Sequence, residues 1–147
     1  MPTYKNTIIS TFHKLILFLG LTFTGHNHDY KMFKSEFSTK ETWFEHLRVF
    51  VDWGYQGICK DYEGENLFIP VKKPRKSKNN PNPSLTDEQK QYNKEVSKTR
   101  ILVENAIGGM KRFKILVHAF RKRKSNFFDD VIVLGAGLWN RNVVQNL

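Results

Sequence analysis

The longest uninterrupted helical pattern in the chain runs over residues 84–113. Thr86 followed three residues later by Gln89 is a capping-box pattern, and the acids directly after Thr86 suit the first turn of a helix. We therefore predict that the helix starts near Asp87. At about 100° per residue, five apolar side chains fall in one arc about 60° wide, which predicts the face that packs into a core. They are Tyr92, Val96, Val103, Ile107 and Met110.

A second row of side chains lies beside this apolar stripe on the same helix. It consists of Ser97, Arg100, Glu104, Gly108 and Lys111. A carboxylate at the edge of a buried stripe is held by the packing of its own helix and can still open onto a cleft, and Glu104 has such a position. A solvated helix with scattered charges gives the same spacing, so the spacing alone leaves both interpretations open.

Two apolar runs near the N-terminus predict a pair of strands. Residues 4–10 and 14–22 are rich in Ile, Leu, Phe and Thr, and the link between them is short enough for a hairpin. A signal peptide of a small exported protein is the weaker alternative for residues 15–23. The run is too short to span a bilayer, and Thr22-Phe23-Thr24 is a poor cleavage site, so we favour strands.

The segment G-H-N-H-D at residues 25–29 follows the second predicted strand. Its histidines and aspartate could ligate a metal ion, but two histidines at i and i+2 point apart on a helix. Asn27 or Asp29 suits the cap of a helix over residues 30–37, and we prefer this structural role. A second helical piece is predicted over residues 39–47.

A short apolar run over residues 49–51 ends at Asp52, which a W-G-Y-Q-G turn follows at once. A carboxylate at the C-terminal end of a buried strand lies where open α/β sheets place ligands and metals, and glycines allow the backbone to approach closely. A simple turn-forming role of Asp52 is the alternative. Further along, residues 67–71 predict another strand and residues 127–139 predict the closing helix.

The net charge of the chain predicts a polyanionic partner. The 147 residues include 24 Lys and Arg but only 14 Asp and Glu, which gives a net charge of +10. Nucleic acid is the first choice and an anionic membrane the second. The single cysteine, Cys59, cannot form an internal disulfide, which fits a reducing compartment. Cations gather in the Pro- and Asn-rich loop 72–83 and at residues 121–124, where DNA contact and a solvated linker are both open. The DNA-binding candidates there are Lys72, Lys73, Arg75, Lys76, Arg121 and Arg123.

Two of these motifs resemble the same family. The pattern R-x3-E-x6-K, formed by Arg100, Glu104 and Lys111, resembles the C-terminal signature of DDE-type insertion-sequence transposases, Y-x2-R-x3-E-x6-K, with Ser97 at the tyrosine position. The string V-D-W-G-Y-Q-G around Asp52 is similar to the D-x-G-Y-x-G segment that carries the second catalytic aspartate of that group. The motifs occur in the family's order, and the resemblance covers residues 7–140.

The resemblance implies an α/β fold of the RNase H-like type, a mixed sheet flanked by helices, here lacking its first strand. It implies a single partial catalytic domain over residues 1–147, with residues 141–147 as a tail. In that family three carboxylates hold two Mg²⁺ ions for DNA cleavage and strand transfer. Asp52 matches the second carboxylate and Glu104 the third, each as a catalytic residue and metal ligand. Arg100 and Lys111 would then contact DNA phosphates near the transposon end.

The first aspartate of the family has no counterpart, because no acid precedes Asp29. We therefore expect an N-terminally truncated protein that is inactive alone. The alternative is a non-enzymatic basic nucleic-acid-binding module, which gives no reason for Asp52 and Glu104 to converge. In a two-metal site their carboxyl oxygens should lie within about 4 to 8 Å of each other. We expect DNA as partner, no membrane, and a cytoplasmic location at the nucleoid, and we leave a homodimer open.

Overall fold

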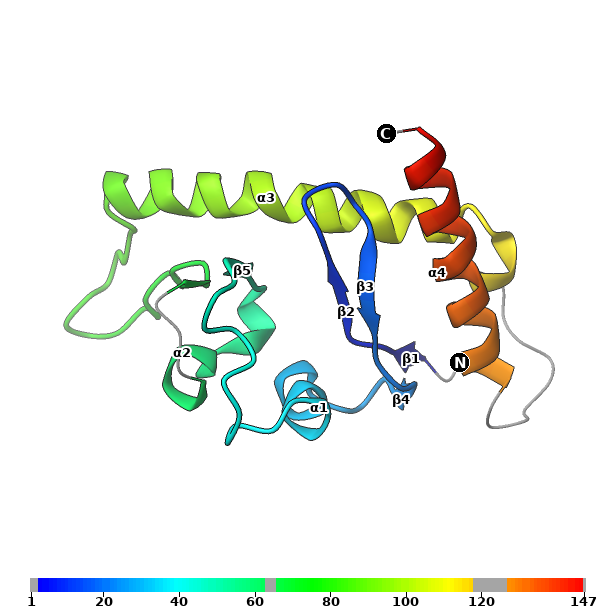
Figure 1. Cartoon of the computed structure of the whole chain (residues 1–147). Coiled ribbons are helices and arrows are strands. Elements are labelled where there is room, and N and C mark those ends of the chain that lie inside the picture. Colours follow the sequence, from blue (N-terminus) through cyan, green and yellow to red (C-terminus); the bar gives the residue numbers. More distant parts are fainter. Residues whose placement is uncertain (1–2, 63–65, 118–126, 147) are drawn as a thin grey trace. The chain divides into compact units, whose positions relative to one another are not determined.

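The computed structural model describes residues 3–62, 66–117 and 127–146 (Figure 1). It is mixed α/β, with small sheets and α-helices. The strands are β1 (Tyr4–Lys5), β2 (Ile8–Ser10), β3 (Ile16–Leu19), β4 (Phe23–Thr24), β5 (Val49–Phe50) and β6 (Leu67–Phe68). The helices are α1 (Asp29–Glu36), α2 (Ile58–Asp61), α3 (Asp87–Lys111) and α4 (Phe127–Gln145), with single 3₁₀ turns η1 (Trp53–Tyr55) and η2 (Lys114–Leu116).

The chain forms two compact units. The first unit comprises Met1–Glu36 and Ile101–Leu147, and the second comprises Phe37–Arg100. The division falls within α3, whose early turns belong to the second unit and whose last turns belong to the first.

The predicted N-terminal hairpin is confirmed, but its strands are shorter than the sequence pattern. β2 and β3 pair antiparallel, with Ile8 opposite Leu19, and β1 pairs separately with β4. Between the two pairs, the side-chain amide of Asn6 donates to the Gly20 carbonyl at 3.1 Å and to the Thr22 hydroxyl at 2.9 Å. Next to these bonds, the backbone contact continues only through the Gly20 N–H, which donates to the Thr7 carbonyl at 2.8 Å. The first predicted strand is thus divided into β1 and β2, whereas the second shortens to β3, and β4 lies beyond its predicted end.

The core of the first unit forms where α3 and α4 meet the hairpin. Its buried members are Ile16, Ala106, Met110, Ala136 and Trp139. A Cβ added at Gly109 would overlap the Trp139 indole, so glycine is required for this close approach. The Trp139 Nε1–H donates to the Lys14 carbonyl at 2.8 Å, and the Asn140 amide both donates to and accepts from the Ile16 backbone at 2.8 Å. These bonds fix α4 on β3.

The long helix begins and packs as its sequence predicts. The Thr86 hydroxyl accepts the Gln89 N–H at 3.2 Å, and the Gln89 amide oxygen accepts the Thr86 N–H at 3.1 Å, which is the reciprocal capping box. On the predicted stripe, Val96 and Met110 are buried, and the other three members are half-buried. The stripe is confirmed, and it is wider than predicted because Ala106 and Gly109 are buried too.

In the second unit, β5 and β6 pair in parallel, with Val49 opposite Leu67. The strand predicted over residues 67–71 ends early, at Phe68. Beyond it, the backbone bonds to side chains of α3: Asn93 holds the Val71 N–H and carbonyl at 2.8 and 2.9 Å, and the Tyr92 hydroxyl donates to the Ile69 carbonyl at 3.3 Å. The helix thus replaces a neighbouring strand at this edge.

The predicted helix over residues 39–47 is wrong, since the structure has turns there. Its aromatic side chains pack back locally: the Trp43 Nε1–H donates to the Ser38 carbonyl at 3.0 Å, and the rings of Phe37 and Trp43 meet edge to face. The helix predicted over residues 30–37 is confirmed as α1, and the closing helix is confirmed as α4, which continues to Gln145. Among the described residues, no helix combines the length and apolarity needed to cross a membrane.

Candidate active-site residues

Asp52 lies directly after β5, where the chain leaves the parallel pair. The preceding residue, Val51, still donates its N–H to the Phe68 carbonyl at 3.0 Å. The Asp52 Oδ1 then accepts the Trp53 N–H at 2.6 Å, and the Asp52 carbonyl accepts the Tyr55 N–H at 3.1 Å, which opens η1. Asp52 therefore does form a turn, as the alternative interpretation holds, but this employs only one of its carboxylate oxygens.

The second glycine of the motif has a conformational role. Gly57 has φ 100° and ψ −11°, in the left-handed region that L side chains rarely adopt, and it starts α2. The turn delivers the next residue, Ile58, into the core, where it is fully buried. The W-G-Y-Q-G string thus folds as a turn that connects Asp52 to α2.

The other carboxylate oxygen of Asp52 faces a cation. Arg100 Nη2 lies 3.2 Å from Asp52 Oδ2, and the two side chains are 29% and 54% exposed. Both residues belong to the second unit. The contact therefore joins the aspartate motif to the R-x3-E-x6-K motif, which the sequence alone connects only through their order.

Two side chains attach α3, the helix that carries Arg100, within the second unit. Asn93 and Tyr92 attach the early turns of α3 to the backbone that continues β6. Burial raises the pKa of Tyr92 above its ordinary value, Cys59 adds to the rise, and the bond to Ile69 opposes it. The Tyr92 hydroxyl thus stays neutral and able to donate at physiological pH.

Glu104 and Lys111 are both exposed on α3, in the part that belongs to the first unit. Lys111 is the last residue of the helix, where a cation is also favoured by the helix dipole. Ser97, at the tyrosine position of the family signature, is exposed in the second unit. Because Asp52 and Glu104 belong to different units, the convergence of their carboxylates stays a prediction.

The cations predicted to contact DNA lie partly in the described residues. Lys72, Lys73, Arg75 and Lys76 are exposed on a segment without helix or strand, next to a turn closed by Ser77 N–H to Asn80 carbonyl at 3.0 Å. Arg121 and Arg123 lie outside the described residues.

A second basic surface, in the first unit, was not predicted from the sequence. In the first unit, an open hollow of about 680 Å³ is lined by His13, Lys14 and Arg112, together with Trp139 and two asparagines, one in the last turn of α4 and one just after it. Lys14 has φ 66°, an uncommon value for a residue other than glycine. The hairpin turn and the end of α3 are far apart in sequence, so their spacing carried no signal of this surface.

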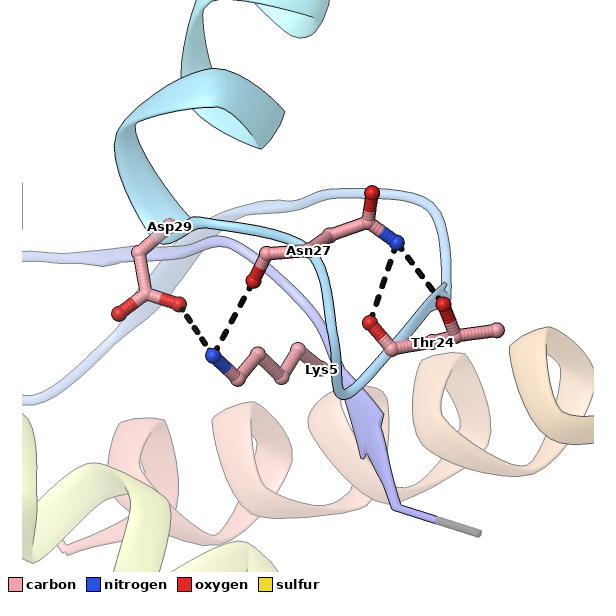
Figure 2. A network of polar contacts seen from close by, with 4 residues as sticks. All are labelled: Lys5, Thr24, Asn27 and Asp29. Atoms are coloured by element: carbon pink, nitrogen blue, oxygen red, sulfur yellow. Dashed lines mark hydrogen bonds and ion pairs between the residues drawn. The ribbon is translucent and has the colours of Figure 1, made fainter.

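The segment 25–29 has a structural role within the first unit. Figure 2 shows the Lys5 ammonium between Asp29, at 3.0 Å, and the Asn27 carbonyl, at 3.2 Å. The Asn27 amide turns back to Thr24, bonding its hydroxyl at 2.9 Å and its carbonyl at 3.1 Å. These bonds tie β1 to the turn between β4 and α1.

The described residues offer oxygen atoms of the type that a divalent metal ion prefers, but too few of them lie together. The exposed Asp52 Oδ2, already paired with a cation, fits one ligand position of Mg²⁺. Among the described residues, however, no group of three or more His, Cys, Asp or Glu could hold a metal ion. The role of Asp52 as a metal ligand therefore stays a prediction.

Comparison with known proteins identifies the family. The chain matches the DDE superfamily endonuclease family over residues 2–140. A protein from Microchaete diplosiphon described as a probable transposase for insertion sequence element IS702 is 37% identical over 103 residues, which cover 70% of this chain and 33% of that protein. The chain thus spans about a third of the length of this relative. No solved structure matches the chain. The chain belongs to the DDE superfamily endonucleases.

Proposed function

We propose that this chain is part of the catalytic domain of an insertion-sequence transposase, a single partial domain of the RNase H-like type. In complete form, such a domain cleaves and joins DNA at the ends of the element. The observation that carries the proposal is the contact of Asp52 with Arg100, because it brings together two motifs that were recognised independently.

Within this proposal, Asp52 and Glu104 are the second and third carboxylates and would hold divalent metal ions. Bound ions would activate water and a DNA 3′-hydroxyl, as two-metal sites do. The turn at Trp53 orients the Asp52 carboxylate through Oδ1 and leaves Oδ2 for a cation. Arg100 and Lys111 would bind DNA phosphates.

A metal-binding experiment tests the role of the two carboxylates. Mn²⁺ added to isotopically labelled protein should broaden the amide signals of Trp53 and Asn105, which are neighbours of Asp52 and Glu104, over the same concentration range. Asp52→Asn should weaken the broadening at both amides, while the control Glu88→Gln, in the exposed first turn of α3, should not. Broadening that Asp52→Asn leaves unchanged would contradict the proposal.

We further propose that the 147-residue chain alone does not cut or join DNA. Two carboxylates of the family's three are assigned, and no acid precedes Asp29 to serve as the first. Incubation with a duplex that contains an insertion-sequence end, in the presence of Mg²⁺ or Mn²⁺, should leave the DNA intact. Metal-dependent nicking that disappears in Asp52→Asn would overturn this part of the proposal.

A non-enzymatic nucleic-acid-binding module is the second candidate, favoured by the exposed cations of the basic loop and by the hollow lined by Lys14 and Arg112. Binding of this kind is driven by phosphate neutralisation, so affinity for duplex DNA should fall steeply between about 50 and 200 mM salt. This candidate predicts that Asp52→Asn changes neither Mn²⁺ binding nor DNA binding. The transposase proposal predicts a loss of Mn²⁺ binding.

A further inference from the structure

Helix α4 is apolar on two opposite faces within the first unit. Its residues 131–138, V-I-V-L-G-A-G-L, include no polar side chain. One face contributes Trp139 to the core. The other face exposes Val133, Leu134 and Leu138, whose exposed fractions are 59%, 64% and 42%. A helix that is apolar all round is normally covered on every side, so the exposed face of α4 has the composition of an interaction surface.

A regular spacing of residues runs along this exposed face. The steps between them alternate between 4 and 3 residues, which is the spacing of the seam of a coiled coil. At about 100° per residue, all of them fall in one arc about 80° wide. They form the α4 seam, which consists of Asp130, Leu134, Gly137, Arg141 and Val144, all of them exposed.

The α4 seam is complementary to itself in the antiparallel direction. When a second α4 lies alongside with its Leu134 opposite Gly137, its Asp130 lies opposite Arg141, because both pairs are centred between residues 135 and 136. Two-fold symmetry makes each pair occur twice. Opposite charges then meet at both ends of the contact, and in the middle a leucine faces a residue without a side chain. A parallel second copy would instead place each charge opposite its own like.

The charged and the small residues of the α4 seam have no other use in the described part of the chain. Among the described residues, the side chains of Asp130 and Arg141 take part in no hydrogen bond or ion pair. A Cβ added at Gly137 meets nothing within 4 Å, whereas one added at Gly135 would meet Leu116 at 2.9 Å. Glycine inside a helix costs stability, and packing within the unit accounts for Gly135 but not for Gly137. The close approach of a second helix accounts for Gly137.

We propose that two copies of this chain associate through the α4 seam, with the helices antiparallel and Leu134 of each copy packed over Gly137 of the other. The occupant is a second copy because the surface that complements the seam in shape and charge is the seam itself. The proposal goes beyond the proposed function and does not depend on it, since no residue of the seam is a candidate active-site residue. One pair of 19-residue helices forms a small interface, so we expect a weak dimer with a dissociation constant between about 1 µM and 1 mM.

The first test measures the mass of the 147-residue protein by sedimentation equilibrium over this concentration range. The wild-type protein should pass from monomer to dimer and form no larger species, because a two-fold contact is closed. Leu134→Gln should raise the dissociation constant about tenfold or more, since it removes the central apolar side chain of the contact from both copies. Leu17→Gln is the matched control, because Leu17 of β3 lies in the same unit and is 69% exposed, against 64% for Leu134. It should leave the dissociation constant unchanged.

The second test reverses the charges of the α4 seam. Asp130→Arg and Arg141→Asp, each alone, place like charges opposite one another at both ends of the contact and should raise the dissociation constant about tenfold. An equal mixture of the two variants should dimerise as the wild-type protein does, since each copy supplies the charge that the other requires. The double variant, which combines both substitutions in one chain, keeps the wild-type net charge and should also dimerise like the wild-type protein.

The outcomes decide between a second copy and the other ways to cover α4. A protein that stays monomeric up to about 1 mM would overturn the proposal. Equal weakening by Leu134→Gln and Leu17→Gln would also overturn it, because that result indicates non-specific apolar association. If Leu134→Gln instead destabilised a monomeric protein against denaturant, another part of the same chain would cover the seam, and the second copy would be wrong.

The charge variants decide the direction of the two helices. If their equal mixture stays as monomeric as each variant alone, the antiparallel pairing is wrong. Recovery of the dimer in both the mixture and the double variant, together with a selective loss in Leu134→Gln, supports the proposal.

Discussion

The two units each contain an ion pair of similar geometry, and the pairs differ in what surrounds them. Lys5 and Asp29 in the first unit lie 3.0 Å apart with side chains 40% and 46% exposed. Arg100 and Asp52 in the second lie 3.2 Å apart with side chains 29% and 54% exposed. Distance and exposure therefore do not tell a structural pair from a candidate site.

The remaining bonds of each pair make the distinction. The Lys5 ammonium also bonds the Asn27 carbonyl, and the Asn27 amide returns to Thr24, so the whole network ties one strand to one turn (Figure 2). Asp52 instead divides its two oxygens between a local turn and a distant helix. The carboxylate of Asp52 thus links the turn after β5 to α3, whereas the bonds around Lys5 stay within one strand and one turn.

The largest effect is expected from the core of the first unit. Trp139→Ala removes a buried indole together with its bond to the Lys14 carbonyl, and it should lower the free energy of unfolding by about 3 to 5 kcal/mol. Denaturant unfolding followed by circular dichroism measures this. Trp53→Ala, a half-exposed indole beside Asp52, is the control and should cost less than about 1 kcal/mol. Equal costs would show that the first unit does not depend on this core.

The glycine turn next to Asp52 comes second. Gly57→Ala places a Cβ in the left-handed region and should destabilise the protein by about 1 to 2 kcal/mol. Gly137→Ala is the matched control, since that glycine lies in α4 with nothing within 4 Å of an added Cβ. It should stabilise the helix by up to about 1 kcal/mol. In chemical denaturation, the two substitutions should change the free energy of unfolding in opposite directions. A stabilising effect of Gly57→Ala would contradict the requirement for glycine at this positive φ.

Alkaline pH should weaken the second unit through its buried Tyr62. The Tyr62 hydroxyl donates to the Phe37 carbonyl at 2.6 Å, and burial, followed by the charge of Asp61, raises the pKa of Tyr62. The folded state thus favours the neutral phenol, so its contribution is complete below pH about 10 and is lost as pH rises through the raised pKa. Tyr62→Phe should cost about 1 kcal/mol at neutral pH and flatten this alkaline decline. If the alkaline decline of the free energy of unfolding were unchanged in Tyr62→Phe, other groups would cause it, and Tyr92 is the first candidate.

Local signals explain which elements the sequence predicted well. The capping box at Thr86, the apolar stripe through Val96, and the helix opened by Asp29 all depend on residues within one or two turns of each other. Such patterns predict structure well because the interacting residues are already close together in the chain. The hairpin was predicted for the same reason.

The predictions from the sequence were wrong where a side chain takes the hydrogen-bonding place of a backbone group. Asn6 lies where the first predicted strand divides, Asn93 bonds the backbone beyond β6, and Trp43 folds back on Ser38 where a helix was predicted. None of these contacts has a characteristic spacing. At the candidate site, the motifs identified Asp52 and Arg100 separately, but their contact needed the fold, as did the hollow lined by Lys14 and Arg112.

The smallest effect, and the sharpest test of the comparison, comes from neutralising the acid of each ion pair. Asp29→Asn removes a charge that pairs with Lys5 and suits the first turn of α1, so it should lower the free energy of unfolding by up to about 1 kcal/mol. Asp52→Asn should change it by less than that, because an amide oxygen can still accept the Trp53 N–H and only a partly exposed ion pair is lost.

Mn²⁺ binding at the Trp53 amide should show the reverse order, with a loss in Asp52→Asn and no change in Asp29→Asn. Measuring stability and Mn²⁺ binding on the same two variants makes each one the control of the other. If Asp52→Asn proved the more destabilising variant and left Mn²⁺ binding intact, the Asp52–Arg100 pair would be the one that stabilises the fold. Asp52 would then be a structural turn residue and no candidate for catalysis.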